Sequence, residues 1–191
     1  MDVRSGDLRS VNVRGPGMKF NALALPGVVE IGIEPETDAR GYFARLFDTE
    51  AFAAQGLPTQ FAQHSLSHNE RAGTLRGLHY QADRPEAKLV RCVAGRAFDV
   101  IVDLRRSLPS YGQWCSVELA ADRGNAVFIP AGCAHGFQTL VDGTELMYCI
   151  DVPYDAQGAA GIRWDDPSLA IDWPLADPIL SARDRALPYL A

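Results

Sequence analysis

Residues 88 to 104 read Lys88-Leu-Val-Arg-Cys-Val-Ala-Gly95-Arg-Ala-Phe-Asp-Val-Ile-Val-Asp-Leu104. β-Branched and other apolar residues dominate on both sides of Gly95, and apolar runs bounded by turn residues are typical of buried strands. The stretch therefore predicts two strands around a tight turn at Ala94 and Gly95.

Strand-like stretches continue on both sides of this pair. They span residues 61–68, 112–119, 126–130, 136–140 and 145–151, at intervals of roughly ten residues in the second half of the chain. Residues 19–33 predict two more short strands around a Pro-Gly turn. No helices alternate with these strands. The expected fold is therefore an all-β double-sheet sandwich or jelly-roll barrel rather than a parallel α/β sheet.

The two ends of the chain differ from this middle part. Residues 1–17 are polar and contain a Gly-Pro-Gly sequence, which predicts a flexible tail before a single domain over residues 18–191. Residues 49–55 predict a short helix at the periphery. After Asp151 the chain is rich in Pro, Gly, Asp and Trp, and we expect an irregular C-terminal segment with one or two short helices.

Composition limits the classes of function. The chain has 191 residues and a net charge of −6, whereas nucleic-acid-binding proteins usually carry a basic excess. It has no apolar run of membrane-spanning length, and its start does not resemble a signal peptide. The four cysteines include no Cys-x-x-Cys pair, which favours reduced, buried thiols in a cytoplasmic protein. We therefore expect neither a nucleic-acid partner nor a membrane partner.

The densest group of reactive side chains is Gly73-Thr-Leu-Arg-Gly-Leu-His-Tyr-Gln81. Alternation along a strand places Arg76 on one face and His79 on the other. An imidazole exchanges protons near neutral pH, and a guanidinium holds anions. A lone histidine on a strand is also often a hydrogen-bonded core residue, and this stretch alone leaves that alternative open.

Four other residues have side chains that suit a ligand site. Lys88 begins a predicted strand, and His135 follows a Pro/Gly turn at the expected mouth of the barrel. Tyr148 and Tyr154 flank the end of a strand. Taken singly, Lys88 also fits an exposed surface lysine, and each tyrosine also fits an aromatic core or rim residue.

Histidine spacing argues against a metal site. Metal-binding barrels of this kind commonly use two histidines one residue apart followed by a carboxylate, and the sequence contains no His-x-His. His64 and His68 would lie roughly 13 Å apart along a strand, too far to share one ion. We expect no metal.

Several blocks of sequence, taken together and in order, resemble the dTDP-4-dehydrorhamnose 3,5-epimerase family, whose members are metal-free enzymes of the cupin or jelly-roll superfamily. The resemblance runs from about Met18 to Leu187 and implies a double-stranded β-helix barrel. The blocks are Asp38-x-Arg-Gly-x-Phe43, Gly73-x-Leu-Arg-Gly-Leu-His-Tyr-Gln81, Lys88-Leu-Val-Arg91, Phe98-Asp-Val-x-Val-Asp-Leu-Arg105, Tyr111-Gly-x-Trp114, Ile129-Pro-x-Gly-x-Ala-His-Gly-Phe137, Gly161-Ile-Arg-Trp-Asp-Asp-Pro167, Ile171-Asp-Trp-Pro174 and Leu180-Ser-x-Arg-Asp184.

The resemblance also implies roles for single residues and a homodimer. In the implied catalytic set, His79 is the base, Asp184 orients it, Tyr148 donates a proton and Lys88 lies beside the reacting sugar. Arg183 stands where the family usually has lysine. The implied contacts to the substrate, a dTDP-linked nucleotide sugar, come from Arg40, Phe43, Gln63, Arg76, His135, Tyr154 and Arg183.

The implied reaction inverts carbon 3, carbon 5 or both in a 4-keto-6-deoxyhexose, for deoxysugars of cell-surface polysaccharide. Both carbons adjoin the carbonyl, so removing either proton gives an enolate, and a base near neutral pKa suits that step. No cofactor is needed, because the substrate's own carbonyl accepts the electrons. A single-site 3- or 5-epimerase, a ketoisomerase and a non-catalytic sugar-nucleotide-binding cupin are the alternatives. The chain departs from the family at five positions that bear on substrate recognition, namely Arg45, His64, Ser65, Cys133 and Ala159.

Overall fold

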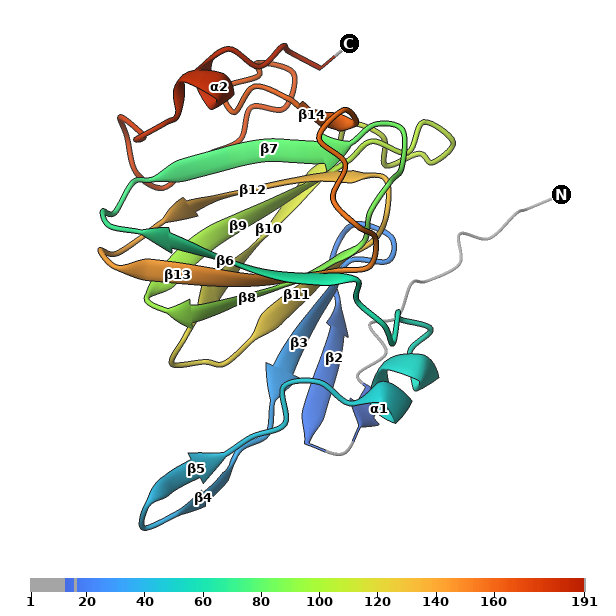
Figure 1. The fold of residues 1–191 in the computed structure, drawn as a ribbon, viewed down its shortest axis with the longest axis vertical. Helices are drawn as coiled ribbons and strands as arrows, with labels where there is room; N and C mark the ends of the chain where they lie inside the picture. The colour runs from blue at the N-terminus through green and yellow to red at the C-terminus, as the bar shows by residue number, and fades with distance from the viewer. Residues whose placement is uncertain (1–12, 16, 191) are drawn as a thin grey trace, which may run out of the picture.

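Two packed antiparallel β-sheets form the body of the protein in the computed structural model, which describes residues 13–15 and 17–190 (Figure 1). The larger sheet has seven strands, in the spatial order β1 (Val13–Gly15), β2 (Met18–Ala22), β3 (Val29–Ile33), β11 (Ala126–Ile129), β8 (Lys88–Ala94), β13 (Thr144–Ile150) and β6 (Gln63–Asn69). The smaller sheet has five strands, in the order β10 (Trp114–Ala120), β9 (Arg96–Asp103), β12 (Cys133–Thr139), β7 (Leu75–Gln81) and β14 (Ala159–Gly161). The predicted all-β jelly-roll fold is confirmed.

The two strands predicted around Gly95 both form, as β8 and β9, but they do not pair with each other. β8 lies between β11 and β13 in the larger sheet, whereas β9 lies between β10 and β12 in the smaller one. Gly95 has a φ of 74°, and a Cβ at this position would lie 2.5 Å from Oγ1 of Thr144. The turn therefore requires glycine, and it carries the chain from one sheet to the other.

Apolar side chains fill three layers, which explains why the central strands have apolar residues at nearly every position. In β8, Val90 and Cys92 point between the sheets, and Leu89 points to the outer face of the larger sheet, where it packs with Phe52 and Phe128. A third cluster covers the outer face of the smaller sheet and contains Leu78, Val100, Val102, Ala134, Ile162 and Leu169. Both sheets are thus buried on both faces over much of their area.

Short elements surround the sandwich. Helix α1 (Thr49–Ala54) forms as predicted, and the Asp48 side chain accepts a hydrogen bond from its first turn. Helix α2 (Ala182–Arg185) lies in the irregular C-terminal segment. Strands β4 (Glu36–Asp38) and β5 (Gly41–Phe43) pair into a hairpin that projects from the body (Figure 1).

The predicted flexible tail, residues 1–17, is wrong in its boundary. Residues Val13–Gly15 form β1, which pairs with β2 after a turn at Gly17, whose φ is 76°. The other tail residues, 1–12 and 16, lie outside the described part of the chain.

The simple alternation predicted for Gly73–Gln81 is also wrong. His135 in β12 faces His79 in β7, and Phe137 faces Arg76, so Gly77 and Leu78 together stand opposite the single residue Gly136. This β-bulge shifts the alternation by one residue. Arg76 and His79 therefore point to the same side of the sheet, and Leu78 points to the opposite side.

Candidate functional site

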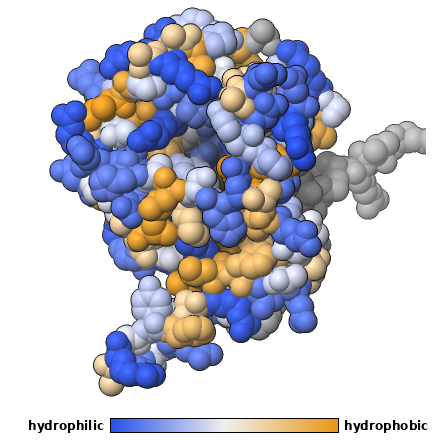
Figure 2. Space-filling view, viewed as in Figure 1, coloured by the Kyte–Doolittle hydropathy of each residue, from blue (hydrophilic) through white to orange (hydrophobic). Residues whose placement is uncertain are grey.

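A cavity of about 320 Å³ lies between the two sheets, and its walls come from β6, β7, β8, β12 and β13. Figure 2 shows a hollow in the face that is turned toward the viewer. Seven of the eleven residues predicted for the site line this cavity, namely Arg76, His79, Lys88, His135, Tyr148, Tyr154 and Arg183. The structure thus brings most of the predicted residues together.

His79 is joined to the C-terminal segment by a short hydrogen bond. Its Nε2 lies 2.7 Å from Oδ1 of Asp184 in α2. Burial alone would raise the pKa of Asp184, but hydrogen bonds from His79 and Ser181 and the charge of Arg183 lower it. An ionised carboxylate only accepts hydrogen bonds, so Nε2 carries the hydrogen and Nδ1 keeps its lone pair. His79 is thus prepared to take up a proton at Nδ1.

A second histidine–carboxylate pair lies deeper between the sheets. Nε2 of His135 is 2.8 Å from Oδ2 of Asp99, a fully buried residue of β9. Burial raises the pKa of Asp99. The charge of His135 and its hydrogen bond to Asp99 act in the opposite direction, but they do not cancel the effect of burial. The Pro/Gly turn before His135 predicts a position at the mouth of the barrel, but the side chain is buried. We did not predict Asp99, although a carboxylate between the apolar residues Phe98 and Val100 was a usable signal.

Tyr148 projects from β13 into the cavity from the larger sheet. Its Oη lies 3.2 Å from Oγ of Ser67 in the neighbouring strand β6. Burial raises its pKa well above the ordinary value for a phenol, and the hydrogen bond with Ser67 lowers it by less. The hydroxyl therefore stays protonated at neutral pH and is available as a proton donor.

Lys88 is buried, so the alternative of an exposed surface lysine is wrong. Its Nζ lies 3.0 Å from Oε1 of Glu86, and both side chains line the cavity. We did not predict a role for Glu86, because a charged residue between a proline and an alanine in a loop usually lies in solvent. The pair places an ammonium group and a carboxylate at the same wall.

Two arginines and a tyrosine lie nearer to solvent. Nε of Arg76 donates a 2.7 Å hydrogen bond to Oδ1 of Asn69. Nη2 of Arg183 lies 3.5 Å from the carbonyl oxygen of Ala159 and is exposed, as is Tyr154. These groups form a positively charged approach to the cavity, which suits an anionic ligand.

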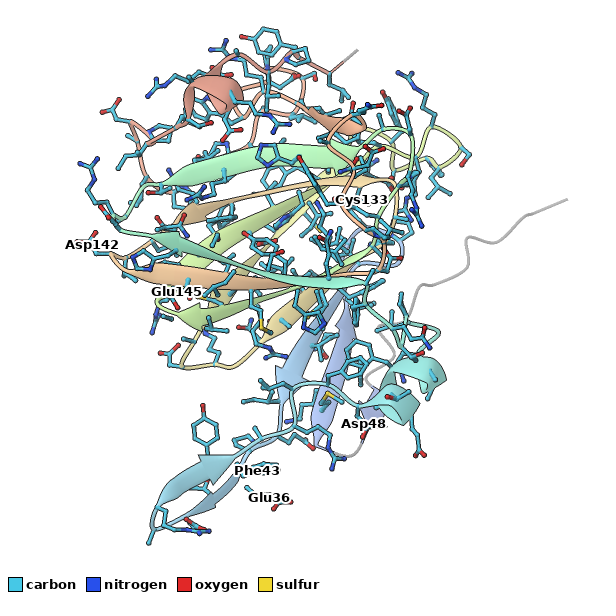
Figure 3. All side chains as sticks on the ribbon, viewed as in Figure 1. Glu36, Phe43, Asp48, Cys133, Asp142 and Glu145 are labelled. Atoms are coloured by element: carbon cyan, nitrogen blue, oxygen red, sulfur yellow. The ribbon has the colours of Figure 1, made fainter. Side chains whose placement is uncertain are left out.

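Three predicted contact residues do not line the cavity. Gln63 donates a hydrogen bond to the backbone of Val152, in the loop that carries Tyr154. Arg40 and Phe43 lie in the β4–β5 hairpin, and Phe43 is 73% exposed. Figure 3 shows Phe43 far from the strands that surround the cavity. Arg40 and Phe43 therefore do not reach the cavity of their own chain.

The positions that depart from the family pattern fall in different places. Ser65 and Ala159 line the cavity, where small side chains leave space. Cys133 is buried in the core between the sheets, and Arg45 forms an ion pair with Asp48. His64 lies on the outer side of the larger sheet, beside Phe61.

The described residues contain neither a cluster that could hold a metal ion nor a helix that could span a membrane. Within residues 13–15 and 17–190, no three His, Cys, Asp or Glu side chains gather closely enough to hold a metal ion. In the same part of the chain, no helix has the length and apolar character needed to cross a membrane.

Comparison with known proteins gives consistent matches. Residues 22–191 match the family model described as dTDP-4-dehydrorhamnose 3,5-epimerase. The chain is 42% identical to the dTDP-4-dehydrorhamnose 3,5-epimerase of Methanothermobacter thermautotrophicus over 170 residues, which cover 87% of this chain and 91% of the relative.

Solved structures with the same fold include two that hold nucleotide ligands. The Bacillus anthracis dTDP-4-dehydrorhamnose 3,5-epimerase, with TDP and pyrophosphate bound, superposes with a TM-score of 0.88 at 38% identity, over 91% of this chain and 99% of that one. A 3′-monoepimerase from Streptomyces bikiniensis in complex with dTDP-quinovose superposes with a TM-score of 0.81 at 34% identity, over 87% and 85% of the two chains.

Proposed function

Because the chain belongs to the dTDP-4-dehydrorhamnose 3,5-epimerase family, we propose that it inverts carbons 3 and 5 of dTDP-4-dehydro-6-deoxyglucose to give dTDP-4-dehydrorhamnose. The observation that carries the proposal is the hydrogen bond between His79 and Asp184, since His79 lines the same cavity as Lys88 and Tyr148. The substrate class follows from the relatives, and the proton chemistry follows from these four side chains.

The proposed reaction begins with proton removal. Nδ1 of His79 takes the proton from a carbon beside the carbonyl, and Asp184 stabilises the imidazolium that forms. The negative charge moves to the carbonyl oxygen, where the ammonium group of Lys88 stabilises it. These two steps need no oxidant or reductant, and they leave an enolate that is planar at the reacting carbon.

Inversion then requires a proton from the opposite side. His79 projects from β7 in the smaller sheet, and Tyr148 projects from β13 in the larger sheet. A substrate held between the sheets would have the base on one face and the phenol on the other. Delivery of the Tyr148 proton to the enolate completes the change of configuration.

We assign the remaining predicted residues to substrate binding. Arg76 and Arg183 suit the diphosphate, because guanidinium groups bind phosphate oxygens in a bidentate manner. His135 suits the sugar, and Tyr154 suits the nucleotide base by stacking. Gln63 acts through the loop whose backbone it holds.

Arg40 and Phe43 lead us to propose that the active species is a homodimer. Both lie in a hairpin that projects from its own chain, so a second copy is needed if they are to touch a substrate. We propose that the hairpin of each protomer reaches the cavity of its partner. A monomer mass by light scattering at micromolar concentration would contradict this assembly. We assign the enzyme to the cytoplasm, since its four cysteines are free thiols, as in reducing compartments.

Proton NMR in deuterium oxide tests the reaction. On incubation with dTDP-4-dehydro-6-deoxyglucose, we expect solvent deuterium at carbons 3 and 5 and a product inverted at both. Inversion at one carbon alone would indicate a single-site epimerase. A protein that binds the nucleotide sugar without incorporating deuterium would be a binding module, and the proposed function would be wrong.

A further inference from the structure

Glu86 and Lys88 form an ion pair whose two members are almost completely shielded from water. Oε1 of Glu86 lies 3.0 Å from Nζ of Lys88, and the side chains are 9% and 8% exposed. Lys88 is the first residue of β8, Glu86 lies in the loop before it, and both line the cavity. A charge buried to this degree is costly unless an opposite charge lies beside it. Each member of the pair thus offsets the cost of burying the other's charge.

We propose that Glu86 is a positioning residue of the epimerase, whose carboxylate keeps the Lys88 ammonium group charged and directed into the cavity. This inference rests on the proposed function, in which Lys88 stabilises the enolate oxygen. Glu86 itself exchanges no proton with the substrate.

The other charged groups around Lys88 do not replace Glu86. Asp99 on β9 is within electrostatic reach of Lys88, but its Oδ2 already pairs with His135 on β12. The other titratable groups of described residues that line the cavity include no carboxylate. They are three residues of β7, two tyrosines from β13 and the loop after it, and one arginine of α2, namely Arg76, His79, Tyr80, Tyr148, Tyr154 and Arg183. Among the described residues, Glu86 is the only ion-pair partner of Lys88.

The inference predicts a pH-dependent loss of activity. Without the carboxylate, a buried ammonium group gives up its proton more readily as the pH rises, and a neutral amine no longer stabilises an enolate. Glu86→Gln keeps the size of the side chain and an acceptor oxygen for Lys88. We expect kcat to stay within about threefold of wild type near pH 6.5 and to fall about tenfold below it near pH 9, with little change in KM.

The Lys88→Arg variant provides a second background, in which residue 88 keeps its positive charge at every pH tested. Arginine stays protonated regardless of its surroundings. Adding Glu86→Gln to the Lys88→Arg variant should therefore lower kcat by the same factor at pH 6.5 and pH 9. An additional alkaline loss in that background would show that the effect does not pass through residue 88, which would overturn the inference.

Glu145→Gln is the matched control. Glu145 also pairs with a basic side chain, at 2.9 Å from Nδ1 of His68, but this pair is exposed (Figure 3). It lies at the far end of the β8–β13 pairing, where Glu145 faces Ala94, whereas Ile150 faces Lys88. We expect the control to keep the wild-type pH profile.

The outcomes separate this inference from the proposed function. Wild-type protein without epimerase activity would refute the function. An active wild type with a Glu86→Gln variant that loses kcat equally at every pH would refute the positioning role alone. If Glu86→Gln does not fold, Glu86→Asp keeps the charge, and it should lower kcat without moving the alkaline limb of the profile. A displaced limb in Glu86→Asp would overturn the inference.

Discussion

Nε2 of His79 lies 2.7 Å from Oδ1 of Asp184, although the two residues are 105 positions apart in the chain. β7 supplies the histidine, and the C-terminal helix α2 supplies the carboxylate. This contact fixes which ring nitrogen carries the hydrogen, and it leaves Nδ1 as the basic atom. It also connects the C-terminal segment to the proposed chemistry.

His79→Ala should abolish turnover while it leaves nucleotide binding nearly intact. The substitution removes the proposed base, whose loss typically costs about 10²–10⁴ in rate, and it leaves the arginines that are assigned to the diphosphate. Steady-state kinetics and calorimetric titration with dTDP measure the two effects separately. A variant that keeps more than about a tenth of wild-type activity would refute the assignment.

Tyr148→Phe should separate hydrogen exchange from inversion. The variant keeps the ring and its packing but lacks the acidic proton, so the enolate should form and then collapse by reprotonation from the His79 side. We expect deuterium at carbon 3 or carbon 5, to the extent that His79 exchanges its proton with solvent, together with much slower inversion. A fast-inverting variant would mean that another acid protonates the second face, such as Tyr154 or water.

Asp184→Asn should destabilise the protein at neutral pH and have less effect in acid. The pKa of Asp184 in the folded state is lowered from the ordinary value of 3.8, despite a burial effect that would raise it. The ionised group therefore stabilises the folded state above pH 3.8, and this contribution is lost as the pH falls through the folded-state pKa. Urea unfolding at pH 7 and near pH 3 measures the difference, which should shrink in acid. A constant difference would refute this linkage.

Gly77→Ala should destabilise the protein by at least about 3 kcal/mol, because it forces atoms together and strains the backbone. Gly77 has a φ of 126°, and a Cβ there would lie 2.5 Å from Cα of Gly136. Gly143→Ala is the matched control, since Gly143 also has a positive φ but has open space around its Cβ position. Denaturant unfolding should show a loss of only about 1 kcal/mol for the control. Equal losses would show that the close approach to Gly136 does not matter.

The sequence predicted the sheets well because periodic apolar residues and turn residues are local signals. Helix α1 and the strands from β8 to β13 lie within a few residues of their predicted positions. The family resemblance predicted seven of the residues that line the cavity. Local patterns alone left His79, Lys88 and Tyr148 open to structural roles, since a strand does not reveal what faces it.

The features that sequence analysis missed depend on contacts between distant segments. The bulge at Gly77 depends on Gly136 in another strand, so counting alternate residues in β7 gave the wrong faces. Glu86 and Asp99 look like a loop carboxylate and an isolated strand carboxylate until Lys88 and His135 lie beside them. Burial and pairing of charges are tertiary properties.

The projecting β4–β5 hairpin allows a complementation test between two defective variants of the protein. If Arg40 acts in the partner's cavity, a mixed dimer of His79→Ala and Arg40→Ala chains has one site with both defects and one site with neither. Two defective proteins, mixed in equal amounts and allowed to exchange subunits, would then recover roughly a quarter of the intact sites. A hairpin that served only its own chain would restore none.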